Sequence, residues 1–411
     1  MSMMATQGLM DDMPRKEVVP TLRGLIQGHS RDLSAQLSDH RLSTFPPTAK
    51  KTFRRLQPAE VARLLGVNEG YLRQIAAKGE AASPLTINGR RSYSVDDLHN
   101  IRHQLAKRPR ADRNYLPHRS AEEHLQVIAV MNFKGGSGKT TTAIHLAQHL
   151  ALHGYRVLAI DLDPQASLTS LFGLQPELDV KPYETLYGAI RYDDDRAPLT
   201  DIVRSTYIPD LHLIPAGLEL MEFEHETPRA LMATSGPTLF FDRIAVALAE
   251  IQAAYDVVIV DCPPQLGYLT LSALTAATAI LVTVHPQMLD VMSMNQFLAM
   301  TGDLLEVIAQ NAPSGEVSDY DWMRYLITRF EPSDGPQNQM VGFLRSLFRE
   351  HVLNHPTLKS TAISDAGLTN QTIFEAERSQ FTRATYDRAL ESVNLVNSEI
   401  EALMRKAWGR K

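Results

Sequence analysis

The sequence predicts an α/β fold in which helices cover both faces of a parallel sheet. From Leu125 onward, short apolar runs that suit buried strands alternate with helical patterns, as in folds of this class. A glycine-rich loop lies directly between the first apolar run and the first helical pattern. The charge is also divided: residues 1–118 carry 19 Lys and Arg against 11 Asp and Glu, whereas residues 119–411 carry 22 against 36. We therefore expect an α/β domain over residues 116–411 and a basic front part with a polyanionic partner.

Length and composition are those of an ordinary soluble globular protein. The 411 residues suffice for two or three domains, with 44% hydrophobic and 21% charged residues and a net charge of −6. No apolar run reaches the length of a membrane span, and the first residues lack a secretory signal, so no membrane partner is expected. The single cysteine, Cys262, permits no internal disulfide and no cysteine-ligated cluster, and we interpret it as a small packing residue. The expected location is the cytoplasm.

Residues 1–48 are predicted to form a helical arm. From Thr21 to about Leu42 apolar residues recur roughly at helical spacing, although two glycines weaken the pattern. The arm has too little apolar surface to fold alone. We expect it to pack on another chain, as a dimerisation element, or on the next domain. A disordered leader is the alternative.

Residues 49–115 are predicted to form a winged helix-turn-helix domain. A short amphipathic helix ends at a glycine, and Asn68 is well suited to cap a second helix over Glu69–Ala77. Asn88-Gly89 lies between apolar residues and predicts a tight hairpin, and a helical pattern follows it. A small helical domain with a solvated basic face would explain the same residues.

The second helix and the hairpin would carry the DNA contacts. Residues Lys50 to Arg119 include 15 basic and 6 acidic side chains, an excess that suits a DNA backbone. Arginine and glutamine can read base edges, whereas lysine mostly meets phosphate. The candidate DNA-binding residues are Tyr71, Arg73, Gln74 and Lys78 on the helix and Arg90 and Arg91 at the hairpin tip.

The glycine-rich loop predicts a site for nucleotide phosphates. The apolar run Leu125–Met131 before it suits a strand buried on both faces, and an alanine- and leucine-rich helix follows it. Glycines let backbone N–H groups approach an anion, and the start of a helix adds partial positive charge. Lys139 can reach the outer phosphates, and the Thr140 hydroxyl suits Mg²⁺. The candidate nucleotide-binding residues are Lys134, Gly135, Gly136, Ser137, Gly138, Lys139, Thr140 and Thr141.

Acidic residues at two strand ends complete the candidate site. Asp161 and Asp163 follow an apolar strand, at the edge where open α/β sheets place their ligands. One of the two could orient the attacking water and the other hold the hydration shell of magnesium. A second apolar run ends in Asp261, the form of a magnesium-binding strand. A structural turn closed by Pro164 is the alternative for the first pair.

The last part of the chain predicts two further strands, Ile280–Val284 and Arg324–Thr328, a turn over Glu331–Gly335, and a final helix over residues 384–408. The apolar positions of this helix recur at helical spacing, and basic residues and Trp408 lie near its end. Packing on the sheet and anchoring to a membrane both explain that pattern, and packing is favoured.

The glycine-rich loop departs from the ordinary phosphate-binding pattern. The ordinary pattern has glycine where this chain has Phe133, and the loop opens with an additional lysine, Lys134. Taken together, Lys134–Thr142, Asp161–Gln165 and Asp256–Pro264 resemble the deviant Walker A P-loop NTPases of the ParA/MinD superfamily, above all ParA-type DNA-segregation ATPases. The added front part is similar to that of the RepA partition proteins of repABC replicons.

The resemblance implies a nucleoid-associated plasmid partition ATPase. Such a protein binds ATP and Mg²⁺ as a sandwich homodimer, hydrolyses ATP weakly, and is stimulated by DNA and its partner. It binds DNA non-specifically, represses its own operon at an operator, and acts with a ParB-type centromere-binding protein. By family position the catalytic residues are Lys134, which crosses the dimer, Lys139 and Asp163, which positions water, and the candidate metal-site residues are Thr140, Asp161 and Asp261.

Three other functions share the predicted fold. A MinD-like positioning ATPase would need the last helix to bind membrane and gives no reason for a helix-turn-helix. A nitrogenase-reductase-like electron carrier would need cluster cysteines, which this chain lacks. A nucleotide-sensing transcriptional repressor is compatible with the same motifs, and DNA-stimulated hydrolysis would distinguish a partition protein from it.

Overall fold

The computed structural model describes residues 21–44, 51–80, 84–87, 90–107, 114–232, 239–311 and 319–410. The chain forms two compact units, Met1–Lys50 and Lys51–Lys411. In the first unit, helix α1 spans Leu22–Thr44 and confirms a helix in the predicted arm. Four of its apolar side chains are exposed, namely Leu22, Leu25, Ile26 and Leu33. Whether the arm packs on another chain, and the domain boundaries at residues 48 and 115, stay predictions.

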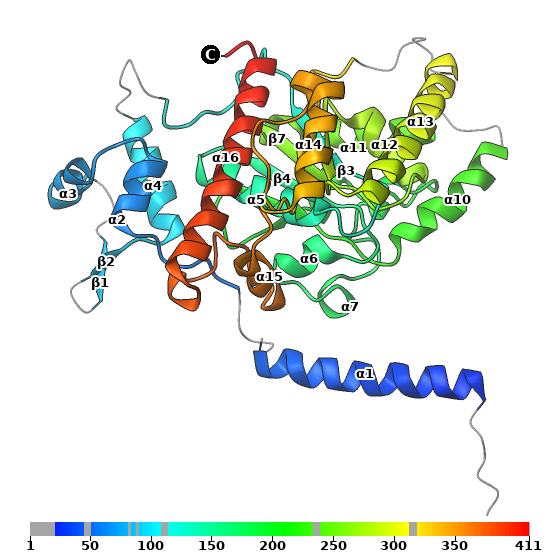
Figure 1. Ribbon diagram of the computed structural model, residues 1–411, viewed down its shortest axis with the longest axis horizontal. Helices are drawn as coiled ribbons and strands as arrows, with labels where there is room; N and C mark the ends of the chain where they lie inside the picture. Colours follow the sequence, from blue (N-terminus) through cyan, green and yellow to red (C-terminus); the bar gives the residue numbers. More distant parts are fainter. Residues whose placement is uncertain are drawn as a thin grey trace, which may run out of the picture. The chain divides into compact units, whose positions relative to one another are not determined.

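The second unit begins with a small helical module, residues 51–107, which we call the front module. Its elements follow in the predicted order of helix, helix, hairpin and helix (Figure 1). They are α2 (Pro58–Leu64), α3 (Glu69–Ala77), the antiparallel pair β1 (Leu85–Ile87) and β2 (Arg90–Ser92), and α4 (Val95–Ala106). The predicted cap is confirmed, since the Asn68 side chain accepts a hydrogen bond of 2.7 Å from the N–H of Tyr71. The Asn88-Gly89 pair lies outside the described residues.

A seven-stranded sheet forms the centre of the unit, in the order β5-β6-β4-β7-β3-β8-β9. All neighbours are parallel except β5 with β6, which confirms the predicted parallel sheet. The strands are β3 (Gln126–Met131), β4 (Val157–Asp161), β5 (Arg204–Ser205), β6 (Leu211–Ile214), β7 (Val257–Asp261), β8 (Ala279–Val284) and β9 (Trp322–Ile327). The sequence did not predict β5 and β6, which are the shortest of the seven and form one edge.

The sheet is covered on both faces because its central strands are apolar throughout. Side chains alternate along a strand, so Ile128 and Val130 of β3 enter one core while Val127 and Ala129 enter the other. The first core is closed by α5 (Lys139–Leu152), α6 (Ser167–Leu171) and α16 (Arg383–Ala407). The second is closed mainly by α8 (Tyr187–Ile190) and by five helices labelled in Figure 1. These are α10 (Leu220–Met232), α11 (Arg243–Ala249), α12 (Tyr268–Ala276), α13 (Met288–Asn311) and α14 (Gly335–Phe348).

Shorter elements complete the fold. They are α7 (Pro176–Asp179), α9 (Leu199–Ile202), α15 (Thr361–Leu368), and single 3₁₀ turns at Phe240–Asp242, Gln252–Ala254, Arg349–His351 and Arg378–Gln380. The turn predicted over Glu331–Gly335 is shorter in the structure, because Gly335 is already the first residue of α14. Asp334 begins that helix by accepting a 3.0 Å hydrogen bond from the N–H of Gln337.

The last helix, α16, packs on the sheet, as the favoured interpretation predicted. Val396, Ile400 and Met404 are buried in the core that α5 closes. Just after the helix, the Trp408 indole donates a 2.9 Å hydrogen bond to the carbonyl oxygen of His124. The apolar stripe of α16 is therefore used inside the protein. Within the described ranges, no helix has both the length and the apolarity that a membrane crossing requires.

Buried polar contacts join the front module to the α/β part. Arg102 of α4 is 5% exposed and donates to the carbonyl oxygens of Leu152, at the end of α5, and of Tyr115. At the other side of the module, the Lys51 ammonium lies 2.9 Å from the buried Glu375 carboxylate. Both cations are largely removed from water and are held by these partners. We call this contact region between the front module and the α/β part the seam.

Candidate nucleotide site

The glycine-rich loop lies between the end of β3 and the start of α5. Gly136 and Gly138 have φ angles of +78° and +89°, which side chains rarely adopt. Gly138 is the residue before α5, and no side chain caps the helix there. The first N–H groups of α5 therefore face the loop, as an anion site requires.

Neighbouring strands hold this loop in place. The Ser137 hydroxyl lies 2.9 Å from the hydroxyl of Thr283 on β8. Just beyond β9, the Thr328 hydroxyl donates to the Ser137 carbonyl oxygen over 2.7 Å, and Arg329 donates to the Gly136 carbonyl oxygen over 3.1 Å. The loop conformation is thus set by side chains that come from two other parts of the sheet.

The two lysines of the loop have different surroundings. Lys139 is 6% exposed, and its Nζ donates to the Lys134 carbonyl oxygen over 3.3 Å. Burial lowers the pKa of Lys139, and the nearby charges of Asp261 and Asp163 oppose that shift. Lys134 points elsewhere, since its Nζ lies 2.6 Å from the Oδ2 atom of Asp290 in the first turn of α13.

Asp261 provides a buried carboxylate without a partner at the end of β7. Neither carboxylate oxygen has a hydrogen-bond partner among the described residues, and the residue is fully buried. Burial and the neighbouring Asp161 raise the pKa of Asp261, whereas the Thr140 hydroxyl and the Lys139 ammonium are close enough to lower it. A carboxylate next to a hydroxyl is a suitable donor set for Mg²⁺. The residues present therefore fit the predicted metal.

Asp161 lies beside Asp261 but is engaged within the protein. The two residues are register partners on the parallel strands β4 and β7. One oxygen of Asp161 accepts hydrogen bonds from the N–H and the hydroxyl of Thr169, over 2.8 and 2.7 Å, and the other accepts from the N–H of Asp163 over 3.1 Å. Burial raises the pKa of Asp161 to about 7, although these hydrogen bonds oppose the shift. Two buried carboxylates side by side favour a cation or a shared proton.

Asp163 and Thr141 lie at the border of the site. Asp163 is partly exposed, accepts a 2.9 Å hydrogen bond from the N–H of Gln165, and influences the pKa of Lys139 and Asp261. Thr141 is partly exposed on α5, where its carbonyl oxygen lies 2.6 Å from the His145 Nδ1 atom. The structure therefore brings the loop, Lys139 and the three aspartates together.

The site contains residues that the sequence analysis missed. Thr283, Thr328 and Arg329 contact the loop, Asp290 pairs with the loop residue Lys134, and Thr169 donates to Asp161. They are separated from their partners by as many as 193 positions. The early lysine of the loop is the one sequence signal among these contacts, because it indicates that an acidic partner such as Asp290 is needed. Cys262 is buried, and burial raises the pKa of its thiol, which agrees with a packing residue.

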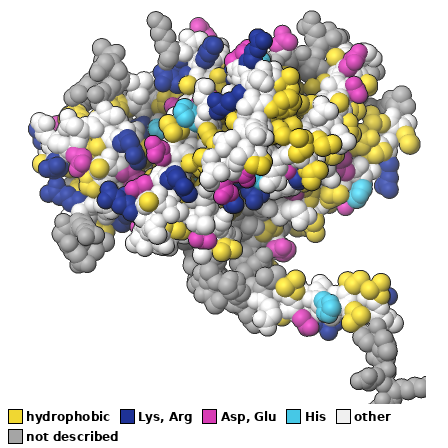
Figure 2. Space-filling view, in the orientation of Figure 1, with side chains coloured by type: hydrophobic (Ala, Val, Ile, Leu, Met, Phe, Trp, Pro, Cys, Tyr) yellow, Lys and Arg dark blue, Asp and Glu magenta, His cyan; other side chains and the backbone are white. Residues whose placement is uncertain are grey.

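The predicted DNA-binding residues lie on the front module, away from the loop in sequence. Arg73, Gln74, Lys78 and Arg91 are exposed, and Tyr71 is partly buried. Arg73 lies 3.9 Å from Glu69 on the same helix, an exposed pair of the weak kind. The side chain of Arg90 is not among those that the structure describes. Figure 2 shows Lys and Arg side chains over the front module, at the left of the view.

Comparison with known proteins identifies the family. A family model described as an AAA domain matches residues 125–311. Two relatives named "Putative replication protein A" cover nearly the whole chain. The one from Rhizobium rhizogenes is 65% identical over 96% of this chain and 97% of its own length, and the one from Sinorhizobium fredii is 54% identical over 93% and 96%. The chromosome partitioning protein ParA of Caulobacter vibrioides is 36% identical over 59% of this chain and 84% of its own length. The chain belongs to the ParA family of partition ATPases.

Solved structures agree with the ParA-type fold. A structure described as "Partition Protein" has a TM-score of 0.62 and 16% identity, and covers 92% of this chain and 98% of that one. An ATP complex of McdA from Cyanothece has a TM-score of 0.53 and 20% identity, and covers 70% and 98%. These two similarities concern the fold alone.

Proposed function

We propose that this ParA-family chain is a plasmid partition ATPase that binds ATP and Mg²⁺ and hydrolyses ATP to ADP and phosphate. The observation that carries the proposal is the buried, unpartnered carboxylate of Asp261 next to Thr140, at the start of α5. A divalent cation would compensate that charge where the loop N–H groups meet phosphate. The replication and partitioning names of the relatives support the biological process.

The proposed role of each site residue follows from its surroundings. Lys139, held at the loop by the Lys134 carbonyl oxygen, would neutralise the outer phosphates. Thr140 and Asp261 would hold Mg²⁺, with Asp161 orienting the strand end next to it. Asp163 is partly exposed and would position the attacking water. Mg²⁺ would supply charge neutralisation at the transferred phosphate.

Lys134 has a separate role in this proposal. It would leave Asp290 and reach the nucleotide of a second copy in a homodimer, as in the family. Its exposure supports this, because the Lys134 side chain is 39% exposed while Asp290 is 4% exposed. Leaving the pair would strip the buried Asp290 carboxylate of its cation, so the phosphate contact in the dimer would have to compensate that cost.

The front module would bind DNA. We assign operator reading to Arg73 and Gln74, and phosphate contacts to Lys78, Arg90 and Arg91. Their exposure, where it is described, and the basic excess of the module support this assignment. The protein would then repress its own operon, bind the nucleoid non-specifically, and act with a ParB-type partner.

The proposed site is tested by titrating the full-length protein with ATP in the presence and absence of Mg²⁺. Lys139→Ala should abolish ATP binding and ATP-dependent dimerisation, because it removes the charge that meets the phosphates. Asp261→Asn should keep binding without Mg²⁺ but lose the gain in affinity that Mg²⁺ provides. Lys406→Ala, an exposed lysine of α16, is the matched control. Normal Mg²⁺-dependent ATP binding by both site variants would refute the site.

A nucleotide-sensing repressor would have the same nucleotide site but would not need DNA-stimulated ATP hydrolysis. Partition requires hydrolysis that increases when DNA is added, so phosphate release is measured with and without DNA. A rate that DNA leaves unchanged, together with nucleotide-dependent operator binding, would favour the repressor.

A further inference from the structure

A histidine pair on α4 faces the α/β part of the protein. His99 and His103 are four residues apart, so they lie on one side of the helix, and their ring centroids are 4.3 Å apart. Asp210 approaches them from the turn before β6, where its φ angle of +60° fixes an unusual backbone conformation. Its Oδ2 atom lies 3.1 Å from the Nδ1 atom of His99. One ligand atom from each of the three residues lies within 4.8 Å of the other two.

This cluster contains an imidazole nitrogen without a partner. The Nε2 atom of His103 is buried and has no hydrogen-bond partner among the described residues. The same holds for the Nε2 atom of His118, whose charge acts on His103. A neutral, buried imidazole nitrogen has a lone pair available for a metal ion.

We propose that His99, His103 and Asp210 form a transition-metal site, with Zn²⁺ as its ion. Two imidazole nitrogens and one carboxylate oxygen are a ligand set that Zn²⁺ accepts in proteins. Ligand bonds of about 2.0–2.2 Å place neighbouring ligand atoms little more than 3 Å apart, close to the separation between His99 and Asp210. Water would take the fourth position.

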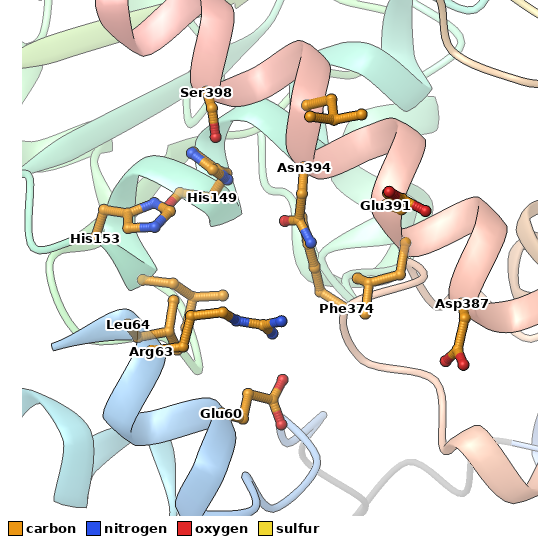
Figure 3. A pocket seen from close by; sticks show the side chains of 13 residues that line it. Glu60, Arg63, Leu64, His149, His153, Phe374, Asp387, Glu391, Asn394 and Ser398 are labelled. Carbon is orange, nitrogen blue, oxygen red and sulfur yellow. The ribbon is translucent and has the colours of Figure 1, made fainter. Parts of the chain in front are cut away.

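A second cluster of similar composition lacks the decisive feature. His149 and His153 of α5 lie near Glu401 of α16, at one wall of a cavity of about 570 Å³ between α2 and α16 (Figure 3). None of the three side chains there has a buried nitrogen or oxygen without a partner. His149 Nε2 lies 3.2 Å from Glu401 Oε2, Tyr155 donates to Glu401 Oε1 over 3.1 Å, and His153 Nδ1 contacts the His149 carbonyl oxygen at 2.9 Å. This hydrogen-bonded network needs no ion, and it supplies the control for the first cluster.

The proposed site would tie two parts of the protein together. His99 and His103 belong to the front module, whereas Asp210 belongs to the strand region of the α/β part. Arg102, between the two histidines in sequence, already crosses the same seam. A bound Zn²⁺ would therefore strengthen the seam, because ligands from both sides would have to separate before the module could move. This inference is independent of the proposed nucleotide chemistry.

The site is tested with tag-free, full-length protein that a chelator has stripped of metal. Zn²⁺ is titrated in competition with a chromophoric chelator, with excess Mg²⁺ present to occupy the nucleotide site. We expect one Zn²⁺ per chain, and an affinity at least about tenfold lower in His99→Ala and in Asp210→Asn. The control variants His149→Ala and Glu401→Gln should keep the wild-type affinity.

A second readout covers variants that fold poorly. Zn²⁺ should raise the melting temperature of the wild-type protein and of Glu401→Gln, but not that of Asp210→Asn. Co²⁺ bound to the wild-type protein should show visible absorption bands of a tetrahedral site with nitrogen and oxygen ligands. Failure of the stripped wild-type protein to bind Zn²⁺ would overturn the proposal. The proposal would also be overturned if the control variants lost Zn²⁺ binding while His99→Ala and Asp210→Asn kept it.

Discussion

The Nη2 atom of Arg102 donates a 2.6 Å hydrogen bond to the carbonyl oxygen of Leu152, the last residue of α5. The end of a helix carries partial negative charge, so a guanidinium there is favourable. The same side chain donates to the carbonyl oxygens of Leu64 and Tyr115, over 3.3 and 3.2 Å. Burial lowers the pKa of Arg102 to about 10, so the group stays charged at neutral pH. One cation thus joins α4 to the helix that begins at the nucleotide loop.

Arg102→Met should destabilise the protein, because it removes the charge and leaves buried carbonyl oxygens without donors. The expected loss is about 1.5–3 kcal/mol of unfolding free energy, the range for hydrogen bonds to charged groups. Urea unfolding of the full-length chain measures it. Arg73→Met, an exposed arginine on α3, should change the stability by less than about 0.5 kcal/mol. Equal midpoints for the two variants would show that the seam contact does not stabilise the fold.

Asp163→Ala should separate ATP binding from ATP turnover. The side chain is partly exposed at the border of the site and makes no contact that holds the loop, so binding should persist while hydrolysis falls. The variant should accumulate as an ATP-bound dimer on DNA. Isothermal titration and phosphate release measure the two steps, with Asp365→Ala on α15 as control. Loss of ATP affinity in Asp163→Ala would instead indicate a structural role.

Arg73→Ala and Arg91→Ala should weaken DNA binding in different ways. A base-reading arginine contributes about 1–3 kcal/mol of discrimination, whereas a phosphate contact weakens all sequences and lowers the salt slope by about one. Arg73→Ala should therefore narrow the difference between the protein's own promoter and random DNA. Arg91→Ala should weaken both and flatten the salt dependence. Salt titrations of the nucleotide-free full-length protein on both DNAs test this, and identical behaviour of the two variants would refute the assignment.

Acid should destabilise the protein partly through His153. Burial, with the neighbouring His149, lowers the pKa of His153 from 6.5 to about 3. Between these values the unfolded chain binds a proton that the folded chain does not, so stability falls as pH decreases from 6.5 towards 3. The slope of the unfolding free energy against pH gives the number of extra protons that the unfolded chain binds. His153→Gln should reduce that number by up to one. Ser398→Ala, from the same cavity, should keep the wild-type slope (Figure 3). A steeper fall in His153→Gln would contradict the sign.

The features that the sequence predicted depend on neighbours in the chain. The Asn68 cap lies three residues from its donor, and the glycines of the loop follow a recognisable strand. Asp261 ends an apolar run whose length already indicates a buried strand. For such features, backbone geometry and local periodicity determine the structure, so the residues can be placed without knowing the rest of the fold.

The features that were missed depend on the order of the strands. Thr328 reaches Ser137 only because β8 and β9 follow β3 in the sheet, and Lys134 meets Asp290 only because α13 starts at the same edge. Periodicity does not determine that order. Helix α12 was missed for another reason: residues 269–274 are all buried, and a helix that is apolar all round has no amphipathic period to detect.

The contacts from Thr328 and Arg329 to the glycine-rich loop have a thermodynamic consequence. They join two loop carbonyl oxygens to side chains that follow β9, which restricts the loop backbone. The entropic cost of ordering, about 1–2 kcal/mol for each residue that must be fixed, is already met during folding. The affinity of the loop for phosphate then reflects charge and hydrogen bonds directly. In the proposed function, contacts to the terminal phosphate would then carry the discrimination between ATP and ADP.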